Sequence, residues 1–179
     1  MCCLVETFPA KHETYEDYLK TLKIAYLYGK TVTLVNTHWR ETNAIMLKNR
    51  RIGLSQSGVV QAFNKIGKRA LLQWCDQSYE HVKELDKEYS DWLCVPRSVR
   101  MTSIKPSGTV SQLVDAASGI HARHNEYYIR TVRADIKDPL CQFMKEKGFP
   151  CEPDVMKPDH TMVFSFPMKS PDGAICRTD

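Results

Sequence analysis

The sequence predicts an α/β protein, because segments with helical periodicity alternate with segments rich in β-forming residues. After Thr14, apolar residues recur every three or four positions from Tyr15 to Tyr26. This spacing predicts an amphipathic helix that Thr14 caps and Gly29 ends. Residues 127–132 and 161–166 are rich in aromatic and β-branched side chains, which is typical of strands.

The remaining elements follow the same patterns. Residues 1–100 are predicted to be mostly helical, and residues 101–179 to combine strands, a loop and short helices. The longest helix is expected over 71–93, with Leu72, Cys75 and Tyr79 on its apolar face. Asp138 and Pro139 predict the start of a helix over 139–147. Further helices are expected over 41–49, 59–66 and 110–117, and short extended segments over 31–35 and 101–104.

Composition excludes several classes of protein. The 179 residues carry a net charge of +4 and are 42% hydrophobic, which excludes an intrinsically disordered chain. Acidic residues are interspersed with the basic ones, so no basic stripe predicts binding to nucleic acid. No apolar run approaches the ~20 residues of a membrane span, and the first residues do not resemble a secretory signal. We therefore expect no membrane partner and a cytoplasmic location.

Seven cysteines are the unusual feature of the composition. Seven is odd, so they cannot all pair within the chain, and a reducing compartment is the simplest interpretation. No C-x-x-C or Cys/His grouping has the spacing of a zinc site, so no metal is expected. Buried, inert thiols are expected at Cys75, Cys94, Cys141, Cys151 and Cys176.

A turn between a predicted strand and a predicted helix is the most informative local pattern. It consists of Pro106, Ser107, Gly108, Thr109 and Val110, preceded by a lysine. The first turn of a helix leaves backbone N–H groups without partners, and a glycine there lets a phosphate approach them. A serine or threonine at this place is more often only a helix cap, so the spacing alone favours a structural role.

Two weaker candidates accompany this loop. Residues 49–58 place two glycines and two serines beside Arg50 and Arg51, which is compatible with a phosphate site or, more simply, with a flexible connection carrying surface arginines. His121 and His124 have the spacing of a helix face, but no third metal ligand lies near them in the sequence. We interpret them as ordinary loop histidines.

Taken in order, several blocks of the sequence resemble the large chain of ribonucleotide reductases, most closely the adenosylcobalamin-dependent (class II) type. These blocks are residues 2–9 (CCLVETFP), 49–58 (NRRIGLSQSG), 105–110 (KPSGTV), 119–133 (GIHARHNEYYIRTVR), 138–140 (DPL) and 163–169 (VFSFPMK). The likeness covers essentially the whole chain. The P-S-G-T-V form favours class II over the di-iron class I enzymes, which usually carry another residue in place of Gly108.

The resemblance implies a ten-stranded α/β barrel and a radical reaction. A thiyl radical, generated through adenosylcobalamin, abstracts the ribose 3′-hydrogen, and a glutamate takes the 3′-hydroxyl proton. The 2′-hydroxyl leaves as water. Two further cysteines supply the electrons and become a disulfide, which thioredoxin or a similar dithiol protein reduces. The implied partners are thus a ribonucleotide, of di- or triphosphate form, and this reductant.

The resemblance also assigns residues. Cys2 falls at one member of the redox-active pair, and residues 106–110 fall on the substrate-phosphate loop, which reverses the structural interpretation above. Cys3 stands where the family commonly has asparagine. Glu6 does not correspond to the catalytic glutamate, because that residue belongs to an N-P-C-G-E-type finger loop expected before Cys2.

The expected finger loop, the partner of Cys2 and a C-terminal cysteine pair do not occur in the 179 residues. We therefore expect one partial segment of the catalytic barrel, from a longer or split reductase, which cannot turn over alone. The alternatives are a non-catalytic nucleotide-binding or regulatory module, an inactive fragment, or a class I large subunit.

Overall fold

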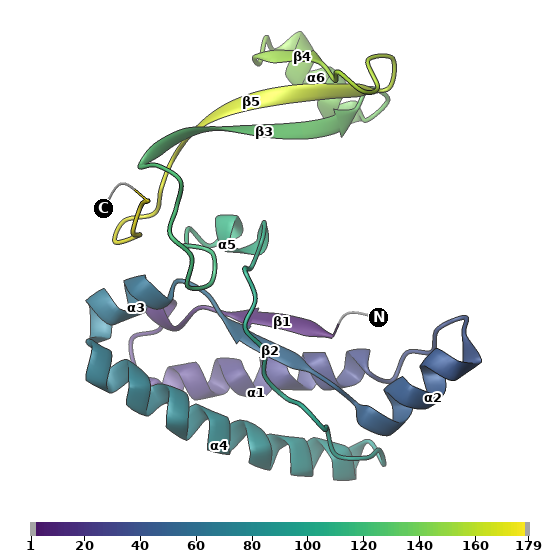
Figure 1. The fold of residues 1–179 in the computed structure, drawn as a ribbon, viewed down its shortest axis with the longest axis vertical. Helices are drawn as coiled ribbons and strands as arrows, with labels where there is room; N and C mark the ends of the chain where they lie inside the picture. The colour runs from purple at the N-terminus through teal and green to yellow at the C-terminus, as the bar shows by residue number, and fades with distance from the viewer. Residues whose placement is uncertain (1–2, 178–179) are drawn as a thin grey trace. The chain divides into compact units, whose positions relative to one another are not determined.

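The computed structural model describes residues 3–177, which form two compact units. One unit contains the described residues up to Arg123 together with Pro171–Ile175, and the other contains His124–Ser170 together with Cys176 and Arg177. The mixed α/β class predicted from the sequence is confirmed in both (Figure 1). The closed ten-stranded barrel is not seen, because the strands between residues 3 and 177 form one sheet of two strands and one of three.

The first unit packs helices against a small parallel sheet. Its elements are β1 (Leu4–Thr7), the 3-10 helix η1 (Pro9–Lys11), α1 (Tyr15–Val32), α2 (Arg40–Asn49), β2 (Gly53–Gln56), α3 (Val59–Ile66), α4 (Lys68–Trp92) and α5 (Val110–Leu113). Strands β1 and β2 are parallel, with Leu4 opposite Gly53 and Thr7 opposite Gln56. Thr102 extends this pairing by a single parallel bridge to Leu54.

The core of this unit lies between the sheet, α1 and α4 (Figure 1). The expected apolar stripe of α1 is confirmed, and the Thr14 hydroxyl caps the helix by accepting from the Asp17 amide. The buried members of the core are Tyr18, Leu22, Tyr26, Ile52, Leu54, Val82, Leu85 and Tyr89. Val5 packs on this core and Thr7 bonds to Tyr18, so β1 turns its odd-numbered residues to the helices and Leu4 and Glu6 to the opposite face.

The predicted end of α1 at Gly29 is wrong, because the helix continues to Val32. Gly29 is buried where α1 crosses the sheet, and a Cβ there would lie 3.0 Å from Ile52 Cγ2. The glycine therefore allows close packing of helix on strand instead of ending the helix. The extended segment expected over 31–35 is also absent, because α1 continues through Thr31 and Val32.

The other helices predicted for the first unit are present, but the buried face of α4 and the length of α5 differ from the prediction. Leu72 and Tyr79, expected on the apolar face of α4, are 51% and 44% exposed. The face that meets the core instead begins at Leu71 and includes Ser78. The helix expected over 110–117 ends after Leu113, and Asp115 adopts a left-handed conformation. The strand expected over 101–104 is reduced to the single bridge at Thr102.

The second unit is an antiparallel sheet with one helix. It consists of β3 (Tyr127–Asp135), α6 (Pro139–Glu146), β4 (Cys151–Pro153) and β5 (Thr161–Lys169), in the order β3-β5-β4. The Asp138 carboxylate caps α6 by accepting from the Leu140 amide, as predicted. Cys141, Met162 and Phe164 form its core. None of the helices between residues 3 and 177 has the length and apolar character required to cross a bilayer.

A buried ion pair joins α1 to α4 in the first unit. Lys30 Nζ lies 2.7 Å from Asp86 Oδ1, and the two side chains are 0% and 5% exposed. Asp86 also accepts from the Tyr26 hydroxyl and the Ser98 amide. Burial alone would raise the pKa of Asp86, but the hydrogen bonds from Lys30, Ser98 and Tyr26 outweigh it and hold that pKa below its ordinary value. The stabilisation from this carboxylate is therefore present above the ordinary Asp pKa and is lost as the pH falls through the lowered value.

Lys30→Met is expected to destabilise the first unit by about 3–5 kcal/mol, because it leaves the Asp86 carboxylate buried without its cation. Urea denaturation followed by circular dichroism measures the effect. Lys83→Met is the matched control, since Lys83 pairs with Glu80 on the exposed face of α4 and its loss should change stability little. Equal midpoints for the two variants would contradict the structural role of the buried pair.

Candidate functional site

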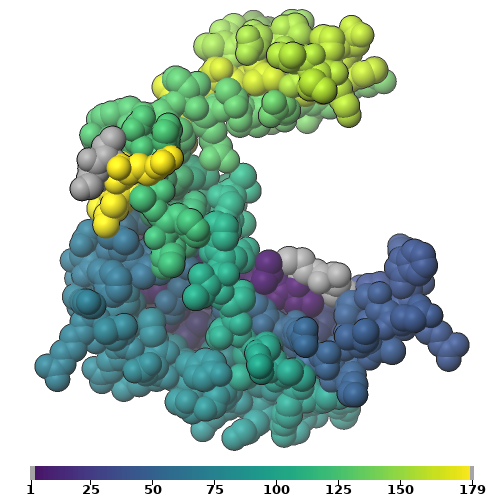
Figure 2. All heavy atoms as spheres, viewed as in Figure 1, coloured from purple at the N-terminus to yellow at the C-terminus, as the bar shows by residue number. Residues whose placement is uncertain are grey.

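The loop predicted to bind phosphate lies on the surface of the first unit (Figure 2). Ser107 is 4% exposed, and its hydroxyl has no hydrogen-bond partner among residues 3–177. Gly108 has φ +62, and a Cβ on it would meet no atom within 4 Å. Pro106, Thr109 and Val110 are exposed. The loop thus combines an open left-handed glycine with a buried hydroxyl that lacks an acceptor.

A short hydrogen-bonded relay supports the base of this loop. Ser57, fully buried between β2 and α3, donates from Oγ to Glu6 Oε1 at 2.5 Å and accepts from the Gly119 amide at 2.9 Å. Gly119 has φ +53, and a Cβ on it would lie 2.8 Å from the Lys105 carbonyl oxygen. The turn at Gly119 therefore packs closely against Lys105, the residue just before the loop.

Charge also connects the loop to β1. Lys105 Nζ lies 3.4 Å from Glu6 Oε2, and the two side chains are 23% and 3% exposed. This contact has ion-pair distance without hydrogen-bond geometry, so Glu6 Oε2 has no hydrogen-bond donor in the described part of the chain. Two buried polar atoms, Glu6 Oε2 and Ser107 Oγ, consequently lack hydrogen-bond partners within this small region.

This arrangement is suited to an anion, although the helix contribution is smaller than predicted. Helix α5 is a single turn of four residues, so its dipole adds little. What remains is the backbone of a tight turn at Gly108 together with the Ser107 hydroxyl. Successive backbone N–H groups of such turns form concavities that bind anions.

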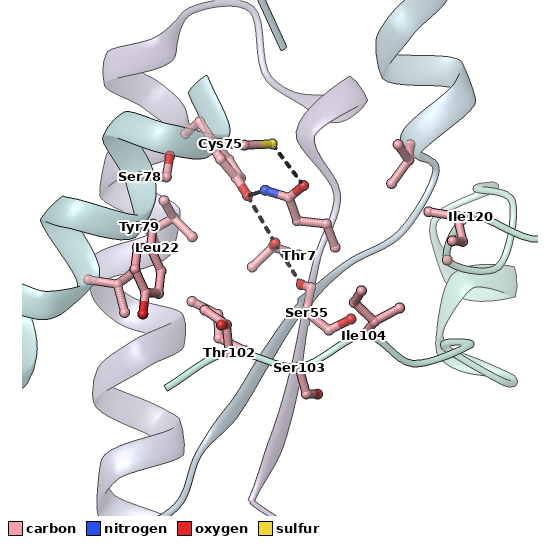
Figure 3. A pocket seen from close by; sticks show the side chains of 16 residues that line it. Thr7, Leu22, Ser55, Cys75, Ser78, Tyr79, Thr102, Ser103, Ile104 and Ile120 are labelled. Carbon is pink, nitrogen blue, oxygen red and sulfur yellow. Dashed lines mark hydrogen bonds between the residues drawn. The ribbon is translucent and has the colours of Figure 1, made fainter. Parts of the chain in front are cut away.

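A cavity of about 520 Å³ lies on the helix side of the sheet (Figure 3). Its wall comes from α1, β2, α4 and the segment 102–104, and Gly119 and Ile120 reach its edge. Four polar groups in the wall bond to one another, whereas Ser78 Oγ is buried without a hydrogen-bond partner among residues 3–177. Cys75 Sγ donates to Gln56 Oε1 at 3.5 Å, Gln56 Nε2 donates to the Tyr18 hydroxyl at 2.8 Å, and that hydroxyl lies 3.2 Å from Thr7 Oγ1.

Burial favours the neutral forms of two titratable groups in the cavity wall. Burial raises the pKa of Tyr18 to about 12 and also raises the pKa of the Cys75 thiol. A raised thiol pKa disfavours the thiolate, which is the reactive form of cysteine. The expectation of an inert thiol at Cys75 agrees with this environment.

The other cysteines follow the prediction in part. Cys141 and Cys176 are buried and Cys151 is half-buried. Cys94 contradicts the prediction of burial, because it is exposed just after the end of α4 with φ +52. The redox role assigned to Cys2 stays a prediction, since Cys2 lies outside the described residues.

The two weaker candidates from the sequence were residues 49–58 and the pair His121 and His124, and the structure places them as follows. The interpretation of Arg50 as a surface arginine is wrong, because Arg50 is 7% exposed and donates from Nη1 to the Thr33 carbonyl oxygen at 2.7 Å. Residues 53–56 form buried β2 and not a flexible connection. His121 and His124 lie in a loop, and among residues 3–177 no three His, Cys, Asp or Glu side chains are grouped to hold a metal.

Sequence reasoning missed the support of the loop. In the sequence, Ser57, Gly119 and Glu6 belong to three separate blocks, and nothing in their spacing predicts that they meet. Glu6 precedes Ser57 by 51 positions in the sequence. Ser57-Gly58 before an apolar helical segment was the available signal, since it marks the turn at the end of a strand.

Comparisons with known proteins give a consistent result. No protein-family model matches the chain. It is 51% identical over 153 residues to a probable adenosylcobalamin-dependent ribonucleoside-triphosphate reductase of Dictyostelium discoideum, a match that covers 86% of this chain and 20% of that protein. It is 45% identical over 168 residues to the adenosylcobalamin-dependent ribonucleoside-triphosphate reductase of Euglena gracilis, covering 94% of this chain and 23% of that protein.

A solved structure is also similar. The crystal structure of a B12-dependent (class II) ribonucleotide reductase superposes with a TM-score of 0.75 at 28% identity, over 96% of this chain and 28% of that one. The present chain therefore spans only about a quarter of the length of the proteins it matches.

Gly119→Ala is expected to destabilise the first unit more than Gly108→Ala. Both glycines have positive φ, so both variants incur roughly 1–2 kcal/mol of left-handed strain. Only at position 119 does the added methyl group also meet a backbone oxygen, at 2.8 Å. Thermal denaturation of the two variants isolates this difference. Equal melting temperatures would show that the turn at Gly119 is not held against the loop.

Proposed function

Since this chain is homologous to a segment of the adenosylcobalamin-dependent (class II) ribonucleotide reductases, we propose that it supplies the substrate-phosphate loop and one redox cysteine of such an enzyme. The reaction is the reduction of a ribonucleotide to a deoxyribonucleotide. The observation that carries this proposal is the loop at residues 106–110, where a buried hydroxyl without a partner adjoins an open left-handed glycine.

The proposed role of the loop is to bind and orient the substrate phosphates. Ser107 has a hydroxyl proton to donate and no acceptor in the described part of the chain. Gly108 keeps the space beside the backbone free, so an oxyanion can approach the amides of the turn. Holding the phosphates also orients the ribose to which they are attached, and orientation of this kind is a major source of rate enhancement.

The proposed role of Cys2 is thiol–disulfide exchange. Together with a second thiol from the rest of the enzyme, it would give up two electrons and two protons per turnover, form a disulfide, and be restored by a dithiol protein such as thioredoxin. The β1 strand begins two residues after Cys2 and leads directly to Glu6 beside the loop. This sequence proximity supports the proposal that the thiol and the phosphate loop serve one active site.

The proposed enzyme would use adenosylcobalamin, on which the similar reductases depend by name. We assign no cobalamin-contacting residue in this chain and derive no step through the cofactor.

Gly108→Val is expected to weaken binding of CTP and of inorganic triphosphate at least about tenfold, because a β-branched side chain at positive φ both strains and fills the turn. Isothermal titration of the chain measures both affinities. Gly67→Val is the matched control, since Gly67 also has positive φ and open surroundings but lies between α3 and α4. Unchanged affinity of the Gly108 variant would reject the phosphate loop.

Cys2→Ser is expected to abolish sustained turnover in a full-length context. A suitable context is the Euglena gracilis enzyme in which the matching segment is replaced by this chain. With thioredoxin and its reductase, the serine variant should give at most one deoxynucleotide per active site, whereas the Cys3→Ser control should continue. Multiple turnovers by the Cys2 variant would remove Cys2 from the redox pair, and an inactive unsubstituted chimera would favour a non-catalytic module.

A further inference from the structure

We propose that Glu6 is a positioning residue for the loop 106–110, acting through Ser57 and Gly119. This inference rests on the proposed function of the loop as a phosphate site. Glu6 is not assigned to the chemistry of the reaction. It is a buried carboxylate that sets where the loop begins.

The first step is the pair of hydrogen bonds at Ser57. The Ser57 hydroxyl donates a hydrogen bond to Glu6 Oε1 at 2.5 Å. A lone pair of the Ser57 oxygen accepts a hydrogen bond from the Gly119 amide at 2.9 Å. A carboxylate acceptor polarises the hydroxyl and strengthens the second bond. Glu6 therefore determines which way the Ser57 hydroxyl points and holds Gly119 in place.

The second step is the contact between Gly119 and the loop. The Lys105 carbonyl oxygen and Pro106 Cα are 2.8 Å and 3.5 Å from the position of a Cβ on Gly119. With so little space, a shift of the Gly119 turn must shift Lys105 and Pro106, which precede Ser107 and Gly108. The Lys105 ammonium group also lies 3.4 Å from Glu6 Oε2, so Glu6 contacts Lys105 directly as well as through Ser57 and Gly119.

The third step is the burial of the carboxylate. The Glu6 side chain is 3% exposed, and burying a charge costs several kcal/mol unless it is fully paired. Here one oxygen has a single donor and the other has only the distant ammonium group. An apolar side chain at this position would be less costly to bury, so the carboxylate is better explained by its effect on the loop than by stability.

The neighbouring residue shows that this property belongs to one face of the strand. Thr7 is equally buried and makes two side-chain hydrogen bonds, to the Tyr18 hydroxyl and the Ser55 carbonyl oxygen. The partners of Thr7 belong to helix α1 and to the neighbouring strand β2, and neither leads to the loop. Thr7 therefore offers a control on the same strand with comparable burial.

The test compares Glu6→Ala, Glu6→Gln, Ser57→Ala and Thr7→Val in the 179-residue chain. Inorganic triphosphate is the probe, with affinity measured by isothermal titration. Glu6→Ala and Ser57→Ala should each weaken binding about tenfold, which corresponds to about 1.4 kcal/mol. Glu6→Gln should recover most of the affinity, because the amide oxygen still accepts the Ser57 hydroxyl. Thr7→Val should lower the melting temperature while leaving the affinity unchanged.

Amide hydrogen exchange without ligand provides a second readout. Glu6→Ala and Ser57→Ala should speed exchange of the Gly119 amide, and Thr7→Val should not. Wild-type affinity in Glu6→Ala, or equal losses of affinity in Glu6→Ala and Thr7→Val, would overturn the positioning role. If the unsubstituted chain does not bind triphosphate, the proposed function fails, and unchanged Gly119 exchange in Glu6→Ala would overturn the inference separately. If Glu6→Ala does not fold, Glu6→Gln against Ser57→Ala decides, because only the serine variant should lose binding.

Discussion

The parallel register of β1 against β2 is the constraint on which the first unit depends. With Glu6 opposite Ser55, Val5 and Thr7 meet the helices while Glu6 meets the loop segments on the other face. Side chains alternate along a strand, so a slip of one residue would place Glu6 in the apolar core and Val5 beside the loop. The register thus determines both the packing of α1 and the support of residues 105–110.

Both faces of this sheet bury polar groups. On the helix side, Cys75, Gln56, Tyr18 and Thr7 form a continuous set of hydrogen bonds, and Ser78 Oγ is buried without a partner among residues 3–177. On the loop side, Glu6 Oε2 and Ser107 Oγ are buried without hydrogen-bond partners in the described part of the chain. Satisfied networks rigidify a core, whereas unsatisfied buried groups are costly and require another explanation. The phosphate group proposed to bind at the loop would supply an acceptor for the Ser107 hydroxyl.

The sequence predicted the helices and the two long strands, and it did not predict the four-residue strands β1 and β2. Helices α1 and α4 and strands β3 and β5 carry enough residues for their periodicity to be recognised. Strands β1 and β2 have four residues each, too few for alternation to be distinguished, and their pairing spans about 50 positions. Local rules favour a helix end at Gly29, whereas the structure uses this glycine for close packing of α1 against Ile52 and Val5.

The order of short motifs in the sequence was enough to indicate the family resemblance and to select residues 106–110, because a tight turn is specified by adjacent residues. Only the tertiary structure decided what supports that turn. Glu6, Ser57 and Gly119 come from three separated segments, and they meet because parallel strands bring their carboxyl ends to the same edge. Contacts between distant segments depend on register and burial, which local sequence patterns do not contain.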